Sequence, residues 1–544
     1  MIRATGLTVT FGKRTLFNEV DIQFTSGNCY GLIGANGAGK STFLKVLAGE
    51  IEANEGRVII EPGKRMAILR QDQDAFNDQG VVDTVIMGHD RLYKLMNERD
   101  ALYAKPDFSE EDGVRAGELE AELAEMNVWE AESEAGNLLN QLGIDDALQQ
   151  KNMAELEGGQ KVRVLLAQAL FGNPDILLMD EPTNNLDLDS IAWLEEFLMN
   201  FQNVVLVVSH DRHFLNRVCT HMADIDYGRI TLFPGNYDFW YQSIQLQMKQ
   251  RGEKNKKAEE KAKELKEFIA RFSSNASKAR QATSRKKLLD KLDIESLPRS
   301  SRKPPYILFQ PERACGKNIL TVEGLNKTLD GEVVLKDFDL TMTQGDKIAF
   351  VGSNGIPKTT LFRILVGEIE PDSGSFAWGG TIKPGYFPKE NSEWFSGNQT
   401  MIDWLRQFSP KEEENFVRGF LGRMLFSGDE SLKKVNVLSG GEKVRCLLAR
   451  IMLGEGNALI LDEPTNHLDL ESITALNNAL IDFPEVVLFA SHDHQFIDTI
   501  ANRIVEIGPY GVIDRRMRFE DYIHDAEIRA LRSEIYHGNV AMSI

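Results

Sequence analysis

The sequence predicts an α/β protein of two similar domains in tandem, joined by a helical hairpin, and three observations lead to this prediction. The chain has 544 residues, too many for one hydrophobic core and enough for two domains of about 200 residues with connections. Its two halves are related by an internal repeat, and each half has an apolar strand followed by a glycine-rich loop. Hydrophobic residues make up 42% of the chain, which favours packed domains over global disorder.

The internal repeat has two offsets. The segment 6–11 matches 324–329 at an offset of 318, whereas the segment 156–160 matches 438–442 at an offset of 282. The first half therefore carries 318 minus 282, or 36, extra residues. We expect them in a helical arm at about 88–135, formed by two helical segments that break around Lys105–Glu110. Between Glu98 and Glu134 there are 13 Asp and Glu against 3 Lys and Arg, so the arm is either a solvated surface excursion or a contact with a partner.

The stretch 245–295 predicts two charged helices between the repeats, and a polar run at 273–277 marks the turn between them. Apolar residues share one face of each helix: Leu265, Phe268, Ile269 and Phe272 on the first, and Leu288, Leu289 and Leu292 on the second. From Lys249 to Lys303 there are 18 Lys and Arg against 8 Asp and Glu. A simple tether needs neither paired apolar faces nor a local charge of this size. We predict a first domain at 1–240, a basic helical linker at 241–316, and a second domain at 317–544 with a short C-terminal tail.

Composition limits the other classes of protein. The net charge of −20 would argue against binding nucleic acid if it were spread evenly, but the linker is locally basic. We find no apolar run of the roughly 18 residues that span a bilayer, and no signal-peptide core at the N-terminus. The four cysteines are scattered without metal-site or disulfide spacing, namely Cys29, Cys219, Cys315 and Cys446. We therefore expect a soluble protein of the reducing cytoplasm.

A phosphate-binding loop follows the apolar strand 29–33 and opens a helical stretch, which is the context that this motif requires. Its residues are Gly34, Ala35, Asn36, Gly37, Ala38, Gly39, Lys40, Ser41 and Thr42. The glycines let backbone N–H groups surround phosphate oxygens, Lys40 adds a positive charge, and the Ser41 hydroxyl suits Mg²⁺. The second half has a matching loop formed by Gly352, Ser353, Asn354, Gly355, Ile356, Pro357, Lys358, Thr359 and Thr360.

Two carboxylates end a buried strand in each half, and a histidine follows the next strand. In the first half Asp180 is placed to hold Mg²⁺, Glu181 to act as the general base towards water, and His210 to reach the terminal phosphate. In the second half Asp462, Glu463 and His492 repeat the pattern. One such histidine is usually structural. Two, each about thirty positions beyond an Asp-Glu pair, make a structural role for both improbable.

The motif Leu-Ser-Gly-Gly-Glu at 438–442, with the two phosphate loops, resembles the ATP-binding cassette (ABC) ATPase superfamily. The segments 180–187 and 462–469 are similar to those of the ABC-F group in particular, and the run 271–284 with the form of both halves most resembles its YbiT-like branch. The resemblance covers essentially the whole chain. It implies tandem ABC-type P-loop ATPase domains, a charged helical linker, no membrane domain, ATP and Mg²⁺ as cofactors, and action on ribosomes.

The resemblance also implies two composite ATP sites, each built from the phosphate loop of one domain and the Gly-Gly signature of the other. Site one would combine the first loop, the Mg²⁺ sensor Gln71, Asp180, Glu181 and His210 with Ser439, Gly440, Gly441 and Glu442. Phe11 would stack on its adenine.

Site two would combine the second loop, Asp462, Glu463 and His492 with Glu157, Gly158, Gly159 and Gln160. It departs from the family pattern at four positions, namely Leu329 for an aromatic residue, Pro357 for glycine, Lys389 for the glutamine and Glu157 for serine. A carboxylate about 4 Å from a phosphate costs roughly 4 kcal/mol, so we expect Lys389 to neutralise Glu157. The alternative is a weaker and slower second site.

These features predict an ATP hydrolase that associates with ribosomes and acts on translation. The basic residues near the linker tip would contact rRNA, with tRNA as a second candidate, namely Arg271, Lys278, Arg280, Arg285, Lys286 and Lys287. The acidic arm would bind a basic ribosomal protein. Two alternatives are an ABC-F antibiotic-resistance protein that protects ribosomes, whose linker loop is usually longer, and the ATPase subunit of a membrane transporter.

Overall fold

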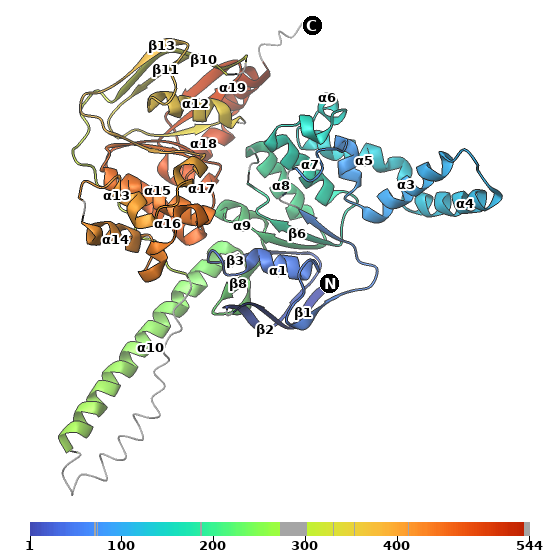
Figure 1. Ribbon diagram of the computed structural model, residues 1–544, viewed down its shortest axis with the longest axis horizontal. Helices are drawn as coiled ribbons and strands as arrows, with labels where there is room; N and C mark the ends of the chain where they lie inside the picture. Colours follow the sequence, from blue (N-terminus) through green and yellow to red (C-terminus); the bar gives the residue numbers. More distant parts are fainter. Residues whose placement is uncertain are drawn as a thin grey trace.

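The computed structural model describes residues 1–537 except for the stretch 273–301 and nine single positions. These positions are Lys13, Arg70, Gln71, Gln73, Asn185, Asp187, Asp330, Ser353 and Glu412. The described chain forms an α/β protein with two similar halves (Figure 1).

The first half contains two sheets in the described residues. A three-stranded antiparallel sheet has the order β2-β1-β4, and a six-stranded sheet has the order β5-β6-β7-β3-β8-β9, in which only β9 runs antiparallel to its neighbour. The strands are β1 (Ile2–Phe11), β2 (Arg14–Phe24), β3 (Asn28–Gly34), β4 (Glu55–Ile60), β5 (Met66–Leu69), β6 (Ile176–Asp180), β7 (Val204–Val208), β8 (His221–Asp226) and β9 (Arg229–Pro234).

The second half repeats this topology strand for strand. Its sheets have the orders β11-β10-β13 and β14-β15-β16-β12-β17-β18. Even the register is repeated, because Ile2 pairs with Phe24 and Leu320, 318 positions later, pairs with Met342. The strands are β10 (Leu320–Leu329), β11 (Glu332–Met342), β12 (Lys347–Val351), β13 (Ser373–Trp378), β14 (Pro384–Phe387), β15 (Ala458–Asp462), β16 (Val486–Ala490), β17 (Arg503–Gly508) and β18 (Gly511–Arg515).

Each large sheet separates two hydrophobic cores. Side chains alternate along a strand, so in β3 Cys29 and Ile33 join the core on the helical side, while Tyr30 and Leu32 join the core beneath the small sheet. Burial on both faces explains why these strands are continuous apolar runs. Because the strands are parallel, their carboxyl ends meet at one edge, and the segments that follow β3, β6 and β7 come together there.

The helices of the first half cover its sheet and form the arm. They are α1 (Lys40–Leu47), α2 (Val81–Ile86), α3 (Asp90–Tyr103), α4 (Glu110–Glu125), α5 (Val128–Gln141), α6 (Asp146–Gln149), η1 (Met153–Glu155), α7 (Gly158–Leu170), α8 (Leu188–Asn200) and α9 (Arg212–Val218). The arm is a helical hairpin of α3 and α4 that extends away from both sheets (Figure 1). The chain breaks where we expected, and α4 restarts with a capping box of Ser109 and Asp112.

The linker begins with one long helix, α10 (Tyr237–Phe272), which projects away from both domains (Figure 1). At 36 residues it is about 54 Å long. Leu265, on its predicted apolar face, is buried. The predicted tip and second linker helix fall within 273–301, outside the described residues.

The second half lacks a counterpart of the arm among its described residues. Its helices are α12 (Gly355–Leu365), η2 (Ser392–Phe395), α13 (Met401–Arg406), α14 (Glu414–Arg423), η3 (Gly428–Leu432), η4 (Val435–Val437), α15 (Gly440–Gly454), α16 (Leu470–Asp482), α17 (His494–Ile500), α18 (Phe519–His524) and α19 (Ala526–His537). Across the part of the chain that the structure describes, every helix is too short or too polar to cross a membrane.

Candidate functional site

A cavity of about 970 Å³ lies between the two halves and is lined by both. It brings together most residues predicted for site one. From the first half these are Phe11, Asn36, Gly37, Gly39, Lys40, Ser41, Thr42, Asp180, Glu181 and His210, and from the second half Ser439, Gly440, Gly441 and Glu442. Three residues of the loop are not among the lining residues, namely Gly34, which ends β3, Ala35 and Ala38. Gln71 lies outside the described residues.

The first phosphate loop has the backbone that wrapping an anion requires. Gly37 and Gly39 have φ values of 74° and 103°, which side chains with a Cβ rarely adopt. Helix α1 begins only at Lys40, after this loop. The Lys40 ammonium donates to Gly34 O at 2.8 Å, so the side chain folds back over the loop where phosphate oxygens would lie.

The second half closes the opposite wall of site one. Ser439 caps α15, where its hydroxyl accepts the Glu442 N–H at 3.4 Å and the Glu442 carboxylate accepts the Ser439 N–H at 2.9 Å. The Asn36 side chain donates to His467 O at 3.2 Å, and the Asn36 N–H donates to Asp469 Oδ2 at 3.4 Å. The first loop therefore touches the second domain directly. Site one is a composite site already assembled from both halves.

The predicted base and histidine of site one are in contact. Glu181 follows β6 with a φ of 53°, a strained conformation that often marks a functional residue. Its N–H donates to Val208 O at 2.8 Å, which holds this conformation against β7. The Glu181 carboxyl lies 3.3 Å from His210 Nε2 and also accepts the His210 backbone N–H at 3.3 Å.

Burial controls the charges of this pair. It raises the pKa of Glu181 to about 8, an effect that the nearby Lys40 ammonium partly opposes. It also lowers the pKa of His210 to about 3, with a further contribution from Lys40. Near neutral pH and without nucleotide, the contact therefore joins a neutral imidazole to a protonated carboxyl group. A Mg²⁺ ion bound with the nucleotide beside Asp180 would bring positive charge close to Glu181 and favour its ionised form.

The hydroxyl and carboxylate predicted for Mg²⁺ are adjacent in each half. Burial raises the pKa of Asp180, and a hydrogen bond from Ser41 partly opposes this effect. Thr359 Oγ1 donates to Asp462 Oδ2 at 2.7 Å, and burial raises the pKa of Asp462 to about 6. A hydroxyl and a carboxylate are oxygen donors of the kind that Mg²⁺ prefers, so both pairs fit the ion.

The second phosphate loop differs in its backbone as well as in its sequence. Helix α12 begins at Gly355, three residues before Lys358, whereas α1 begins at Lys40 itself. Pro357 occupies the place of Gly39, and its ring fixes φ near −65°, so the positive φ of the first loop is inaccessible there. The chain winds into a helix instead, with the Asn354 side chain accepting the Ile356 N–H at 2.8 Å. Pro357 thus removes both a donor and the loop conformation.

The two unusual charges of site two lie in different surroundings. Lys389 Nζ lies over the second loop, 3.3 Å from where a Cβ on Gly355 would be, and its charge acts on Lys358 and Asp462. Glu157 instead begins α7 in a capping box, with its N–H donating to Gln160 Oε1 at 3.1 Å. Lys389 lines the cavity, whereas Glu157, Gly158, Gly159 and Gln160 do not. The pairing of Lys389 with Glu157 stays a prediction.

Glu463 and His492 keep the arrangement of their counterparts. Glu463 has a φ of 50°, and its carboxylate lies 3.2 Å from His492 Nε2. Both line the cavity, although neither Lys358 nor Thr359 does. Lys358 is buried and donates to Gly352 O at 3.0 Å, as Lys40 does to Gly34. Site two therefore retains its chemical groups but has an altered loop.

Some predicted residues cannot be placed, and some important ones were missed. Ser353 and the predicted RNA contacts at 278–287 lie outside the described residues, as does the side chain of Arg271. The contact of Asn36 with Asp469 was missed, although the Leu-Asp ending of the repeated 462–469 motif was a signal for it. Arg302 carries no signal in the sequence, yet it joins both domains, since its guanidinium pairs with Asp224 at 2.5 Å and Glu471 at 3.0 Å.

Comparison with known families and sequences agrees with this architecture. A family described as ABC transporter matches residues 17–184 and 335–466, and a second family of the same description matches 223–308, across the linker. An uncharacterized ABC transporter ATP-binding protein, YkpA of Bacillus subtilis, is 60% identical over 98% of this chain and 100% of its own length. The probable ATP-binding protein YbiT of Escherichia coli O157:H7 is 46% identical over 97% of this chain and 100% of its own.

Solved structures share the fold at lower sequence identity. A structure described as RNase-L Inhibitor has a TM-score of 0.58 at 20% identity, covering 92% of this chain and 87% of that one. The archaeal ribosome recycling factor aABCE1, solved with the ribosomal stalk protein aP1, gives the same values. At this identity the likeness concerns the tandem fold alone.

Proposed function

Because the chain belongs to the ABC-F family of ATP-binding proteins, we propose that it is a ribosome-associated ATPase acting on translation through its linker. Both halves are ABC ATPase domains, so the protein binds ATP and is an ATP hydrolase. The proposal is that two ATP molecules, each with Mg²⁺, hold the domains together, and that hydrolysis at Glu181 releases them. Ser41, Gln71 and Asp180 would hold the ion in site one, and Thr359 and Asp462 in site two.

The observation that carries the proposal is the position of Arg302, where the linker enters the second domain. Its side chain is 7% exposed and pairs with Asp224 of β8 and Glu471 of α16. Its guanidinium also lies over the Trp240 ring, at the base of α10, 4.7 Å from the ring centroid. One side chain therefore joins the first domain, the second domain and both ends of the linker.

The contacts of Arg302 are connected to site one through the start of α16. Glu471 lies two residues after Asp469, which accepts the N–H of Asn36 in the first phosphate loop. A change in the position of α16 on ATP binding or release would therefore move the partner of Arg302. This arrangement supports a linker whose orientation depends on nucleotide in site one.

The linker has the charge that an RNA partner requires. Its 18 Lys and Arg against 8 Asp and Glu stand out in a chain of net charge −20, and each neutralised phosphate contributes to affinity by releasing a counterion. Helix α10, which carries nine of these basic residues, extends away from both domains (Figure 1). We propose that the linker contacts rRNA, with tRNA as a second candidate, through Arg271, Lys278, Arg280, Arg285, Lys286 and Lys287. The protein would then work in the cytoplasm.

The arm offers a second contact of opposite charge. Most of the exposed charged side chains of its helices are carboxylates, and Arg115 of α4 is already paired with Glu98 of α3 at 2.8 Å. We propose that the remaining acidic surface binds a basic ribosomal protein.

Ribosome co-sedimentation tests the proposal. The double variant Glu181→Gln and Glu463→Gln keeps the nucleotide contacts but removes both predicted bases, so with ATP it should accumulate on ribosomes. A matched control adds Ala at Lys278, Arg280 and Lys286 to that variant and should bind ATP equally well but lose the ribosome. If the double variant with ATP stays in the supernatant, the proposal is wrong.

Two other outcomes distinguish the rival functions. An antibiotic-resistance protein of this family would also bind ribosomes but would raise drug tolerance when overproduced, and we expect unchanged drug susceptibility. The ATPase subunit of a transporter would co-purify with a membrane protein in pull-down experiments, whereas we expect ribosomal components to co-purify with this protein.

A further inference from the structure

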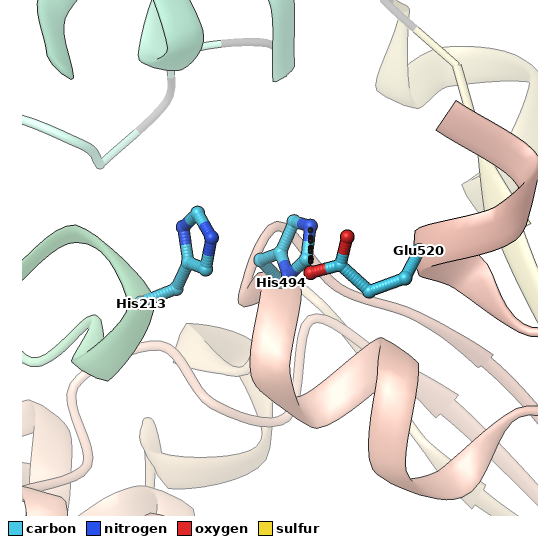
Figure 2. Close-up of side chains that lie close together, drawn as sticks. All are labelled: His213, His494 and Glu520. Carbon is cyan, nitrogen blue, oxygen red and sulfur yellow. Dashed lines mark ion pairs between the residues drawn. The ribbon is translucent and has the colours of Figure 1, made fainter. Parts of the chain in front are cut away.

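Two histidines from different domains are in contact across the interface. His213 lies on α9, three residues after His210, and His494 begins α17, two residues after His492. Their rings are stacked with centroids 4.1 Å apart and an angle of 19° between the planes. Figure 2 shows the two rings facing each other, with the carboxylate of Glu520, from α18, at the far edge of His494.

These three side chains offer a compact set of donor atoms. One ligand atom from each of His213, His494 and Glu520 lies within 4.8 Å of the others. His494 Nε2 is 3.7 Å from Glu520 Oε1, which is too long for a hydrogen bond. That nitrogen is buried and has no hydrogen-bond partner among the described residues. A buried and unsatisfied nitrogen is costly unless something else occupies its lone pair.

A buried carboxylate orients the other histidine. Glu195 on α8 is 4% exposed, and its Oε1 lies 3.0 Å from His213 Nδ1. A proton on Nδ1 then donates to Glu195 and leaves Nε2 as the basic nitrogen. Metal-bound histidines are usually held in this way, with the second ring nitrogen donating to a carboxylate.

We propose that His213, His494 and Glu520 bind a divalent transition-metal ion, with Zn²⁺ the best match, across the interface between the two domains. Two imidazoles and one carboxylate are a known zinc donor set, which leaves a fourth position for water. With Zn–N distances of about 2.0–2.1 Å, tetrahedral donors lie roughly 3.4 Å apart, so the side chains must close in on the ion by about 1 Å. The stacked rings must also rotate about their side-chain bonds, because each nitrogen lone pair lies in the plane of its ring. Glu520 is 46% exposed, and its other contact, with the exposed His524 at 3.5 Å, lies at the surface and can give way to this movement.

The protonation of the cluster suits such an ion. Burial lowers the pKa of His494 to about 4, so its imidazole is neutral at physiological pH and needs no deprotonation. The hydrogen bond with Glu195 raises the pKa of His213, so protons compete with the metal there and acid weakens binding.

A metal at this position would couple to ATP. One ligand comes from the first domain and two from the second, so only the docked arrangement presents all three. A ligand that stabilises the docked domains, such as ATP, then raises the affinity for the metal, and bound metal stabilises the docked domains by the same free energy. Bound metal should therefore slow the separation of the domains after hydrolysis.

Metal titration of the intact chain tests the proposal. Metal-free protein is titrated with Zn²⁺ against a chromophoric chelator in excess Mg²⁺, and Co²⁺ is added separately to record its spectrum. We expect one Zn²⁺ per chain and a tetrahedral Co²⁺ spectrum without sulfur-to-metal bands. His213→Ala and His494→Ala should each weaken binding at least tenfold, and Glu520→Gln, at a half-exposed position, should do so without affecting folding.

Two matched controls identify the site. His221→Ala removes a histidine of the same domain outside the cluster and should leave affinity unchanged. Cys29→Ser with Cys219→Ser removes the buried thiol pair, whose sulfur atoms lie 3.9 Å apart, and should also leave it unchanged. The proposal is overturned if wild-type protein binds no stoichiometric Zn²⁺, if affinity survives all three cluster substitutions, or if it disappears with the cysteines.

Discussion

Replacing Arg302 with methionine should destabilise the docked protein and uncouple the linker from the ATPase domains. The side chain is almost completely buried, and it faces two carboxylates, at 2.5 Å in Asp224 and 3.0 Å in Glu471. Methionine preserves much of the volume but leaves both carboxylates without their cation. Trp240 would remain as a hydrogen-bond donor to Asp224, at 3.2 Å, but it brings no charge.

The size of the expected loss in stability follows from the burial of Asp224 and Glu471. Asp224 is 9% exposed in its side chain and Glu471 is 18% exposed, so water can replace the lost guanidinium only in small part. Removing one partner from a buried ion pair costs about 3–5 kcal/mol. For domains of about 150–250 residues, this corresponds to a fall in melting temperature of roughly 6–20 °C.

The assay is thermal unfolding, followed by ATPase measurement with and without ribosomes. Arg302→Met should melt earlier and lose ribosome stimulation, whereas Arg313→Met, an exposed position bonded only to backbone carbonyls, should resemble wild type. Adding Asp224→Asn and Glu471→Gln to Arg302→Met should recover most of the stability, since no unpaired buried charge remains, but not the stimulation. A melting temperature for Arg302→Met within 1–2 °C of wild type would refute the reasoning.

Three further predictions concern the nucleotide sites. The raised pKa of Glu181 means that its favourable contribution to folding is complete below about pH 4.5 and is lost as pH rises towards about 8. Glu181→Gln should therefore stabilise nucleotide-free protein by a margin that widens from pH 5 to 8, and a constant margin in melting temperature would count against it. Pro357→Ala restores the backbone N–H, and Pro357→Gly restores the N–H and also permits the positive φ. The affinity of site two for fluorescent ATP should therefore increase from wild type to Pro357→Ala and again to Pro357→Gly. One recovered bond to phosphate is worth about 1.5–3 kcal/mol, or roughly 10–100-fold in affinity; equal binding by all three proteins would contradict the account. Finally, Glu157→Lys or Lys389→Glu alone should impair ATP-driven closure measured by interdomain fluorescence transfer, and the exchanged pair should partly recover it, whereas additive losses would exclude the pairing.

Most of the fold was predictable because the same pattern occurs twice. A phosphate loop after an apolar strand fixes the position of that strand, and a match at a constant offset transfers each element from one half to the other. The 36-residue difference between the two offsets located the α3–α4 arm, whose helices break where Pro106 and Ser109 favour a turn and a helix start. The domain boundaries themselves remain predictions.

The contacts between the domains were harder to predict from the sequence, because they depend on how two surfaces dock rather than on a local pattern. Asn36 and Asp469 are separated by 433 residues, and although the Leu-Asp ending of the repeated motif marks Asp469, nothing in the sequence names Asn36 as its partner. His213 and His494 are not even equivalent positions of the repeat, since Arg212 corresponds to His494. Pro357 was recognised as a lost donor, but the earlier start of α12 required the backbone to be seen.

We propose that the two composite sites are unequal and that hydrolysis depends mainly on site one. Single-turnover hydrolysis of radiolabelled ATP by Glu181→Gln and, separately, by Glu463→Gln tests this most directly. The account predicts that Glu181→Gln reduces the rate by several orders of magnitude and that Glu463→Gln retains most of it. Equal losses in the two variants, or the larger loss in Glu463→Gln, would contradict it.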